Sequence, residues 1–304
     1  MSEQNQIKPN HCVICDSNSI VFWAKEYKGD NILFCNNCSV RFIENFKTSE
    51  ENTDLYGDEY FESKITDTTE IINNEKKLFI RDFKSIEAIS RLKVLTPHTN
   101  FLDIGTGGGR YLKLLKSLGY DELSGFDVTD LNKIDLMKFN VSLHTGNFSD
   151  IPPNHQFDVI TAFHVLEHID TPKEFLANVK ELLAPDGVIY FLLPNEGGLT
   201  SRIKSFQSKY LFKPKPYKHL SPGHHSIFYN SSVVKRLFTD VGYTVKFCKG
   251  TRSSVKRRSI IGKFVQYLLA KFGSNSWLEV VAINKVEFEK NIIKELSEVS
   301  HDFN

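Results

Sequence analysis

The sequence lacks any long apolar stretch. Its longest uninterrupted apolar run covers residues 188–193, far short of the roughly 20 residues that a membrane-spanning helix needs. The first ten residues, MSEQNQIKPN, have no apolar segment, so we expect no signal peptide. Neither sign of charge prevails, because the sequence has 38 basic and 37 acidic residues and a net charge of +1. The chain as a whole has no strong attraction to nucleic acid or membrane, and we predict a cytoplasmic protein.

Cysteine is scarce, and four of the five cysteines fall within the first 38 residues. They form two C-x-x-C pairs, Cys12 with Cys15 and Cys35 with Cys38. A pair of this spacing places two sulfurs on one ion at a tight turn, and four thiolates complete a tetrahedral zinc site. A redox-active pair and reduced cysteines without an ion are the alternatives, but neither explains why the spacing occurs twice. The sequence predicts a zinc ribbon over residues 1–46 with a structural Zn²⁺, since sulfur fills all four positions.

From residue 97 to residue 287, short apolar runs alternate with amphipathic segments, which is typical of an α/β domain with a mainly parallel sheet. Residues 47–96 are predicted as a helical connector and residues 288–304 as a tail. The predicted strands cover residues 101–104, 123–128, 157–163, 188–193, 243–248 and 278–283.

Helices are predicted over residues 75–94, 110–118 and 232–241, with a further helix that begins at Pro172. In the first of these, Phe83 belongs to an apolar stripe that we expect to be buried. At the start of the last, Thr171 is predicted as the N-cap and Glu174 as its partner in a capping box.

A glycine-rich turn joins a predicted strand to a predicted helix in the segment FLDIGTGGGRYLKLL, residues 101–115. Glycines allow the backbone to approach a ligand closely and to adopt positive φ. The helix N-terminus that follows attracts a carboxylate or phosphate group. The spacing differs from the dinucleotide pattern G-x-G-x-x-G. The third glycine, Gly109, comes one residue early, and Arg110 occupies the position where the pattern has its last glycine.

Two aspartates indicate which ligand the loop receives. Asp103 lies two residues before Gly105, where its charge would repel a pyrophosphate but pair with an ammonium group. Asp127 ends the next predicted strand, and its separation from Gly105 matches that of the acid that binds ribose hydroxyls in nucleotide-binding sheets. S-adenosylmethionine has a ribose, a carboxylate and an ammonium group, and it has no phosphate. A glycine turn that serves only packing would leave the two aspartates unexplained.

Five motifs in order, LDIGTGGG, FDV, GNFSDIP, FDVITAFHVLEHI and LLAPDGVIYFLLPN, resemble those of class I S-adenosylmethionine-dependent methyltransferases. The resemblance covers residues 101–243 and implies a Rossmann-like sheet of seven strands. It also implies that Asn147, where the family usually has Asp, meets the adenine amino group. The cofactor-binding residues that it implies are Asp103, Gly105, Thr106, Gly107, Gly109, Asp127, Val128, Asn147, Phe148, Phe163 and His164.

The arrangement of a zinc ribbon ahead of such a domain is similar to that of the methyltransferases of sugar and polysaccharide pathways. Residues 54–61, DLYGDEYF, also resemble the segment that follows the ribbon in those enzymes. In the zinc-bearing sugar C-methyltransferases the base is a histidine that follows an acid. The match implies that His225 is the catalytic base, while His224 stands where their acid would be. The resemblance therefore implies methyl transfer to oxygen, carbon or nitrogen of a small acceptor, a sugar nucleotide or glycan precursor.

Glu167 and His168 are a second candidate pair. Similar segments in quinone-pathway O-methyltransferases help to bind a divalent cation, but here His164 replaces the preceding acid, so a structural role is favoured. O-methylation of a quinone-like or aromatic metabolite is the first alternative function. A non-catalytic binding protein is the second, although the ribbon has few cations to bind RNA.

Residues 255–272, within a predicted insertion over residues 251–276, have the pattern of a basic amphipathic helix. Such a helix suits either peripheral contact with an anionic membrane or packing on the core with its cations in solvent. Packing on the core is the favoured interpretation, because most helices of globular proteins turn an apolar stripe to the core.

Overall fold

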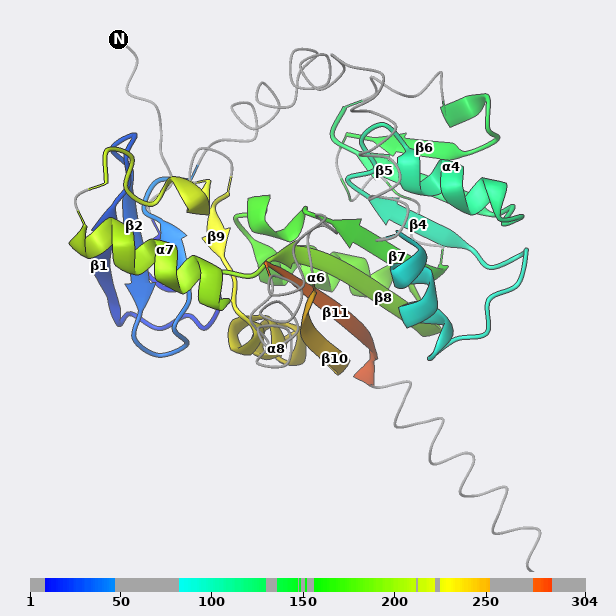
Figure 1. Cartoon of the computed structure of the whole chain (residues 1–304). Coiled ribbons are helices and arrows are strands. Elements are labelled where there is room, and N and C mark those ends of the chain that lie inside the picture. The colour runs from blue at the N-terminus through cyan, green and yellow to red at the C-terminus, as the bar shows by residue number, and fades with distance from the viewer. Residues whose placement is uncertain are drawn as a thin grey trace, which may run out of the picture.

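The computed structural model describes residues 9–46, 82–129, 136–146, 148, 151, 156–211, 213–221, 225–251 and 276–285. The predictions made for residues 47–81, 252–275 and 286–304, and for Asn147 and His224, lie outside these ranges. Two sheets organise the described residues, one of seven strands and one of four (Figure 1). None of the helices in these ranges combines the length and apolarity needed to cross a bilayer.

The seven-stranded sheet has the strand order β10-β11-β8-β7-β4-β5-β6. Five strands run parallel, and β10 and β11 pair antiparallel at one edge. The mainly parallel, Rossmann-like sheet of seven strands is therefore confirmed. The strands are β4 (Phe101–Ile104), β5 (Leu123–Asp127), β6 (Ser142–Thr145), β7 (Phe157–Phe163), β8 (Leu183–Pro194), β10 (Tyr243–Thr251) and β11 (Trp277–Asn284).

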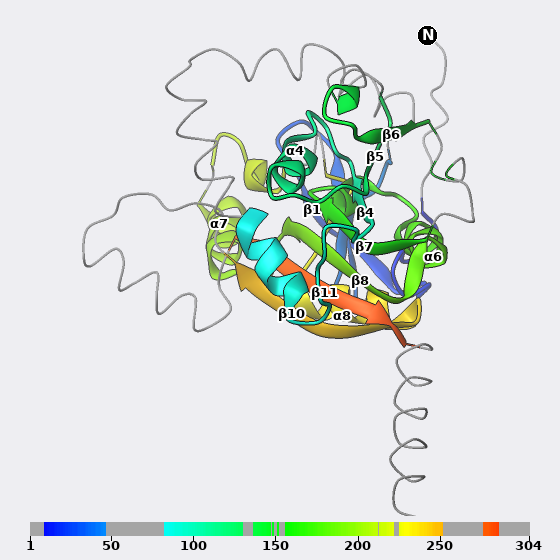
Figure 2. The ribbon, with the colours of Figure 1, turned by 90° about the vertical axis from the view of Figure 1, so that its right-hand side faces the viewer.

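Helices cover both faces of this sheet (Figure 2). α4 (Arg110–Ser117) connects β4 to β5, and α6 (Pro172–Glu181) connects β7 to β8. The connection from β4 to β5 and the connection from β7 to β8 run toward opposite edges of the sheet. Because such connections are right-handed, α4 and α6 lie on opposite faces of the sheet. The point where the direction changes lies between β4 and β7, and ligands of such sheets bind beyond the carboxyl ends of the strands there. The glycine loop and His164 follow these two ends.

The prediction that Phe83 is buried is wrong, because its side chain is 48% exposed. The helix over residues 82–90 buries Ala88 and Ile89 together with two polar residues, Asp82 and Ser85. Asp82 forms an ion pair with Arg110 at the start of α4, and Ser85 Oγ donates to the Tyr111 hydroxyl at 3.2 Å. These polar contacts orient the helix, and the apolar stripe alone does not.

The predicted capping box of α6 does not form. Thr171 is the N-cap residue, but its side chain accepts no hydrogen bond from the first turn of the helix. Its ψ of 65° departs from the extended conformation in which an N-cap side chain reaches the second and third amides.

The cap of α8 (Ser231–Asp240) provides a test of stability. Asn230 Oδ1 accepts the backbone N–H groups of Ser232 and Val233, each at 3.0 Å. We expect Asn230→Ala to lower the free energy of unfolding by about 1 kcal/mol, because two amides lose their acceptor. Thr171→Ala is the matched control and should lower it by less than about 0.5 kcal/mol. Urea denaturation measures both, and equal losses would contradict this account.

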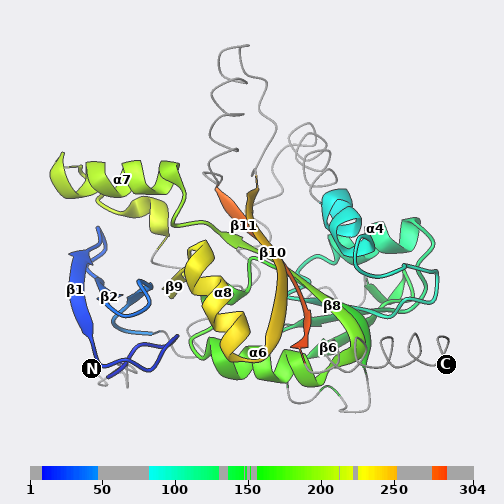
Figure 3. The same ribbon diagram turned by 90° about the horizontal axis from the view of Figure 1, so that it is seen from below.

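The four-stranded sheet joins the cysteine-bearing segment to the main domain. β1 (Ile20–Lys25), β2 (Asn31–Cys35) and β3 (Arg41–Ile43) form an antiparallel ribbon. β9 (Ile227–Phe228) adds to the free edge of β3, although it lies in the last third of the chain (Figure 3). The buried side chains of the ribbon also belong to the hydrophobic cluster that contains α6 and α8. The ribbon and the main domain therefore share a sheet and a core.

Candidate active site

The glycine loop, residues 105–109, follows β4 and leads into α4. Gly105, Gly107 and Gly109 have φ of 66°, 51° and 68°, a region that other residues adopt at a cost. Space is also limiting, because a Cβ at Gly105 would lie 2.5 Å from Val165 Cγ2 and one at Gly109 would lie 2.1 Å from Leu136 Cδ2. Backbone conformation and packing both require glycine at Gly105 and Gly109.

The two aspartates singled out from the sequence lie at the ends of neighbouring strands. Asp127 Oδ2 accepts the backbone N–H of Gly107 at 2.7 Å, so this carboxylate contacts the glycine loop directly. Asp103 is 3% exposed and accepts the Thr161 hydroxyl at 2.6 Å from the adjacent β7. The carboxyl ends of β4 and β5 thus present two acids on either side of the loop.

Other polar and aromatic groups near the loop suit a nucleoside ligand. Thr106 has a buried Oγ1 with no hydrogen-bond partner in the described ranges, an arrangement that costs about 1–3 kcal/mol unless a ligand supplies one. Val128 is 54% exposed at the end of β5. The Phe148 ring lies 5.0 Å from that of Phe126, and Phe163 packs between two tyrosine rings. The loop region therefore fits a ligand that has both polar groups and a ring.

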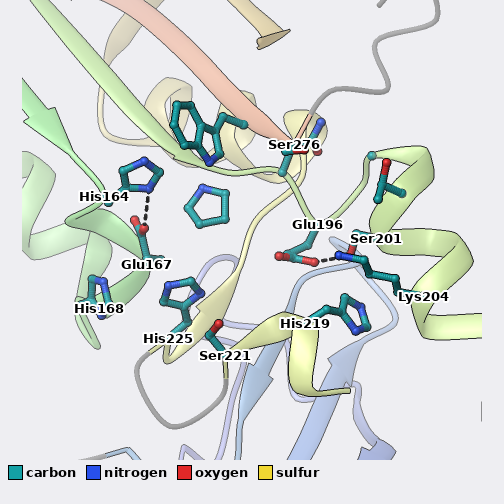
Figure 4. A pocket seen from close by; sticks show the side chains of 15 residues that line it. His164, Glu167, His168, Glu196, Ser201, Lys204, His219, Ser221, His225 and Ser276 are labelled. Carbon is teal, nitrogen blue, oxygen red and sulfur yellow. Dashed lines mark hydrogen bonds and ion pairs between the residues drawn. The ribbon is translucent and has the colours of Figure 1, made fainter. Parts of the chain in front are cut away.

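A cavity of about 640 Å³ lies beyond the carboxyl ends of β7 and β8 (Figure 4). The glycine loop does not line this cavity, but His164 in its wall directly precedes Val165, the residue that a Cβ at Gly105 would meet. All lining residues except Pro194 and Gly198 carry hydrogen-bonding side chains. The lining residues are His164, Glu167, His168, Pro194, Asn195, Glu196, Gly198, Thr200, Ser201, Lys204, His219, Ser221, His225, Ser276 and Trp277.

Three histidines surround Glu167, which is 1% exposed, at one end of this pocket. Glu167 Oε1 lies 3.2 Å from His164 Nδ1, and its Oε2 has no hydrogen-bond partner in the part of the chain that is described. Burial acts to raise the pKa of Glu167, but the hydrogen bond with His164 and the nearby charges of His168 and His225 outweigh it and lower the pKa. The carboxylate is therefore ionised near neutral pH.

The polar atoms of Glu167, His168 and His225 lie within 4.8 Å of one another, and the two imidazole rings are 5.0 Å apart. Such a group suits either a general base or the ligand set of a divalent cation. The sequence favoured a structural role for Glu167 and His168 and did not predict that His225 joins them.

Two backbone hydrogen bonds of the next residue, Ser226, hold His225 in this position. The N–H of Ser226 donates to the Glu167 carbonyl at 2.9 Å, and the Ser226 carbonyl accepts the N–H of Ile43 from the ribbon at 3.0 Å. The next two residues are β9, which pairs with β3. The ribbon therefore anchors the loop that carries this histidine.

The opposite wall consists of the end of β8, α7 (Leu199–Tyr210) and η3 (Lys218–Leu220). Glu196 is 6% exposed, burial raises its pKa, and its carboxyl group accepts the Ser201 hydroxyl. Arg41 of β3 donates to the Glu196 carbonyl at 3.0 Å, and its guanidinium lies 4.6 Å over the Trp23 ring. β3 thus supports both ends of the pocket.

A family model described as a methyltransferase domain matches residues 72–246. This span is more than half of the 304 residues and includes the glycine loop, both aspartates and the histidine cluster. The chain belongs to this methyltransferase family.

The chain also resembles ubiquinone biosynthesis O-methyltransferases. The mitochondrial protein of Dictyostelium discoideum is 26% identical over 134 residues, which cover 38% of this chain and 42% of that protein. The protein of Pasteurella multocida (strain Pm70) is 27% identical over 161 residues, which cover 44% and 66%. The chain thus spans about two fifths to two thirds of the length of these relatives.

Among solved structures, a chain from the complex between the Haloferax volcanii Trm112 methyltransferase activator and a methyltransferase has a TM-score of 0.52. The match has 14% sequence identity and covers 78% of this chain and 99% of that one. At this identity the likeness shows a shared fold.

The four cysteines of the ribbon lie close together. Cys12 Sγ lies 3.5 Å from Cys38 Sγ, Cys15 Sγ lies 3.6 Å from Cys35 Sγ, and all four sulfurs lie within 4.8 Å of one another. Sulfurs at about 2.3 Å from a tetrahedral zinc ion are roughly 3.8 Å apart, so the four fit one ion. The hydrogen bond between Cys12 and Cys38 lowers the pKa of the Cys12 thiol and raises the pKa of the Cys38 thiol.

His164, His219 and His225 all line the pocket, and His219 makes a hydrogen bond with a serine of α7. Burial and the charges of Lys204 and Arg41 lower the pKa of His219 to about 4, and its Nε2 lies 3.1 Å from Ser205 Oγ. It is therefore a neutral hydrogen-bonding group near pH 7.

Several pocket residues were missed from the sequence. Glu196 lies two residues after the end of the buried strand β8, and the binding of ligands at the carboxyl ends of parallel strands was a usable signal for it. Lys204 and Trp277 carried no such signal, because they come from a helix and an antiparallel strand that are far apart in the sequence.

Proposed function

We propose that this protein transfers a methyl group from S-adenosylmethionine to a small polyhydroxylated acceptor, a sugar nucleotide or glycan precursor, in the cytoplasm. The hydrogen-bonding lining of the pocket supports this acceptor class most directly. Trp277 offers the flat apolar surface on which a sugar ring packs, and the polar groups around it would bind hydroxyls. A quinone ring with an apolar tail would leave these groups without partners at a cost of about 1–3 kcal/mol each.

The glycine loop would hold the methyl donor. Asp103 would pair with its ammonium group, Asp127 would accept its ribose hydroxyls, and Phe148 would pack against its adenine ring. Thr106 would gain the partner that its buried hydroxyl lacks. When bound, the donor supplies an electrophilic methyl group on a sulfonium sulfur. Because His164 in the pocket wall directly precedes Val165 beside Gly105, the acceptor oxygen would lie on the far side of that methyl group.

His225 would act as the general base in this reaction. It takes the proton of the acceptor hydroxyl as the oxygen gains the methyl group, and the resulting imidazolium lies beside the ionised Glu167. A buried carboxylate that stabilises a charged imidazole in this way raises the basicity of the histidine.

O-methylation of a quinone-like or aromatic metabolite is the second candidate function. Glu167, His168 and His225 form a plausible ligand set for a divalent cation, which would activate a phenolic hydroxyl. The names of the sequence relatives favour this candidate, and the polar lining of the pocket favours the first.

A panel of acceptors decides between them. We expect methyl transfer from S-adenosylmethionine to at least one nucleotide sugar, unaffected by a chelator that does not remove the ribbon zinc, and no transfer to dihydroxybenzenes. Radiolabelled methyl groups and mass spectrometry of the products measure it. Methylation of a dihydroxybenzene that requires added Mg²⁺ or Mn²⁺ would overturn the sugar assignment, and the absence of S-adenosylmethionine binding would overturn both.

A further inference from the structure

α7 faces the protein with polar side chains. Among its residues, Ser205 alone is buried. Ser201 Oγ donates to Glu196, Ser205 Oγ contacts His219 Nε2 at 3.1 Å, and Ser208 Oγ accepts a backbone N–H at 3.0 Å. The three serines recur at spacings of four and three, so they form one side of the helix. This side closes the wall of the pocket.

The outward side of α7 is apolar. Leu199, Ile203, Phe206 and Tyr210 follow one another at spacings of four, three and four residues, and their exposures are 41%, 48%, 60% and 55%. Leu211, directly after the helix, is 60% exposed. A helix of a globular protein normally turns such a stripe to the core, and an exposed apolar patch of this kind indicates a binding surface. Figures 1 and 3 show α7 at the outer edge of the molecule beside the ribbon strands.

The segment that carries this apolar stripe has charge of one sign. Residues 197–239 contain no Asp or Glu, although the whole chain has nearly equal numbers of acidic and basic residues. Six of the cations of this segment lie on α7 or in the loop that follows it. They are Arg202, Lys204, Lys209, Lys213, Lys215 and Lys218.

This combination identifies the partner by its chemistry. A second copy of the chain would bring the same cations together, and they would repel one another. A nucleic acid would neutralise the cations but would leave the aliphatic Leu199 and Ile203 without a suitable contact. An anionic bilayer matches both features, since its headgroups are negative and its acyl chains lie directly beneath them.

We propose that α7 binds the surface of an anionic lipid bilayer, with its apolar stripe inserted between the headgroups and its lysines against the lipid phosphates. The inner side of the same helix forms the acceptor pocket, so this orientation holds the pocket close to the membrane surface. The inference does not depend on which acceptor is methylated.

Sedimentation with lipid vesicles tests the proposal on the full chain. We expect binding to vesicles of phosphatidylcholine and phosphatidylglycerol, and weaker binding to phosphatidylcholine alone or at high salt. Ile203→Ser/Phe206→Ser should lower the partition coefficient about tenfold or more, because two inserted side chains are lost. Lys209→Gln/Lys215→Gln should lower it by about fivefold for each charge removed. Val94→Ser/Phe139→Ser, which removes exposed apolar residues elsewhere, is the matched control and should change nothing.

A second measurement does not depend on those variants. Phe206→Trp should show a blue shift of its added fluorescence when anionic vesicles are present, because the indole leaves water. No shift, or full binding by Ile203→Ser/Phe206→Ser, would overturn the proposal. Loss of binding in Arg257→Glu/Arg258→Glu alone would assign the contact to residues 255–272 and also overturn it. A wild-type dimer that Ile203→Ser/Phe206→Ser dissociates would show a subunit interface instead.

Discussion

Replacement of His225 by alanine is expected to lower kcat for methyl transfer by roughly 10²- to 10⁴-fold, the usual contribution of a general base. The affinity for S-adenosylhomocysteine should stay within about twofold, because the variant leaves the glycine loop and its two aspartates intact. Steady-state kinetics and calorimetry measure the two quantities. The acidic limb of the pH–rate profile should disappear in the variant, since a base that must lose its proton is no longer present.

His98→Ala is the matched control, because this exposed histidine lies outside the pocket and its loss should leave kcat unchanged. Glu167→Gln keeps the shape of the buried side chain but removes the charge beside the imidazole, so a smaller loss of kcat is expected. If His225→Ala retains kcat, or loses product affinity to the same extent as turnover, His225 is not the base. If the wild type needs a divalent cation and His225→Ala weakens binding of that cation, His225 is a metal ligand.

The strands and the cofactor loop were predictable because their signals are local. β4 and β7 are buried along nearly their whole length and therefore appear as short apolar runs bounded by polar residues. The glycines at 105, 107 and 109 signal a positive-φ turn by residue type alone. β6 was missed, because its sequence, SLHT, is short and polar and it lies at an exposed edge of the sheet.

The acceptor pocket was largely unpredictable, because it depends on pairing between distant segments. Two residues, Ile227 and Phe228, form β9 against β3, and no periodicity reveals a strand of that length. That pairing places His225 beside Glu167, which belongs to a much earlier part of the chain. The histidine loop could be identified from a resemblance, but its partners depend on how the ribbon meets the main domain.

Removal of the ribbon zinc is expected to abolish methyl transfer while cofactor binding persists. β3 follows directly on the second cysteine pair, and it holds β9 through backbone pairing and the Glu196 carbonyl through Arg41. Without the metal the two cysteine turns beside β3 would lose the ion that joins them, so both ends of the pocket would lose their support. We expect the wild type to contain one zinc ion, and we expect Cys35→Ser to lose it and to lower kcat/KM more than a hundredfold.

Elemental analysis, turnover and calorimetry with S-adenosylhomocysteine together test this expectation. Cys248→Ser is the matched control, because this cysteine lies on β10 and should affect neither zinc content nor turnover. A Cys35→Ser variant that keeps its zinc or its full activity would contradict the role of the ribbon in the pocket. A variant that loses cofactor binding along with turnover would show that the ribbon supports the whole fold. Retention of cofactor binding alone would show that the metal acts through β3 on the acceptor wall, which is the side of the site where His225 and Glu196 lie.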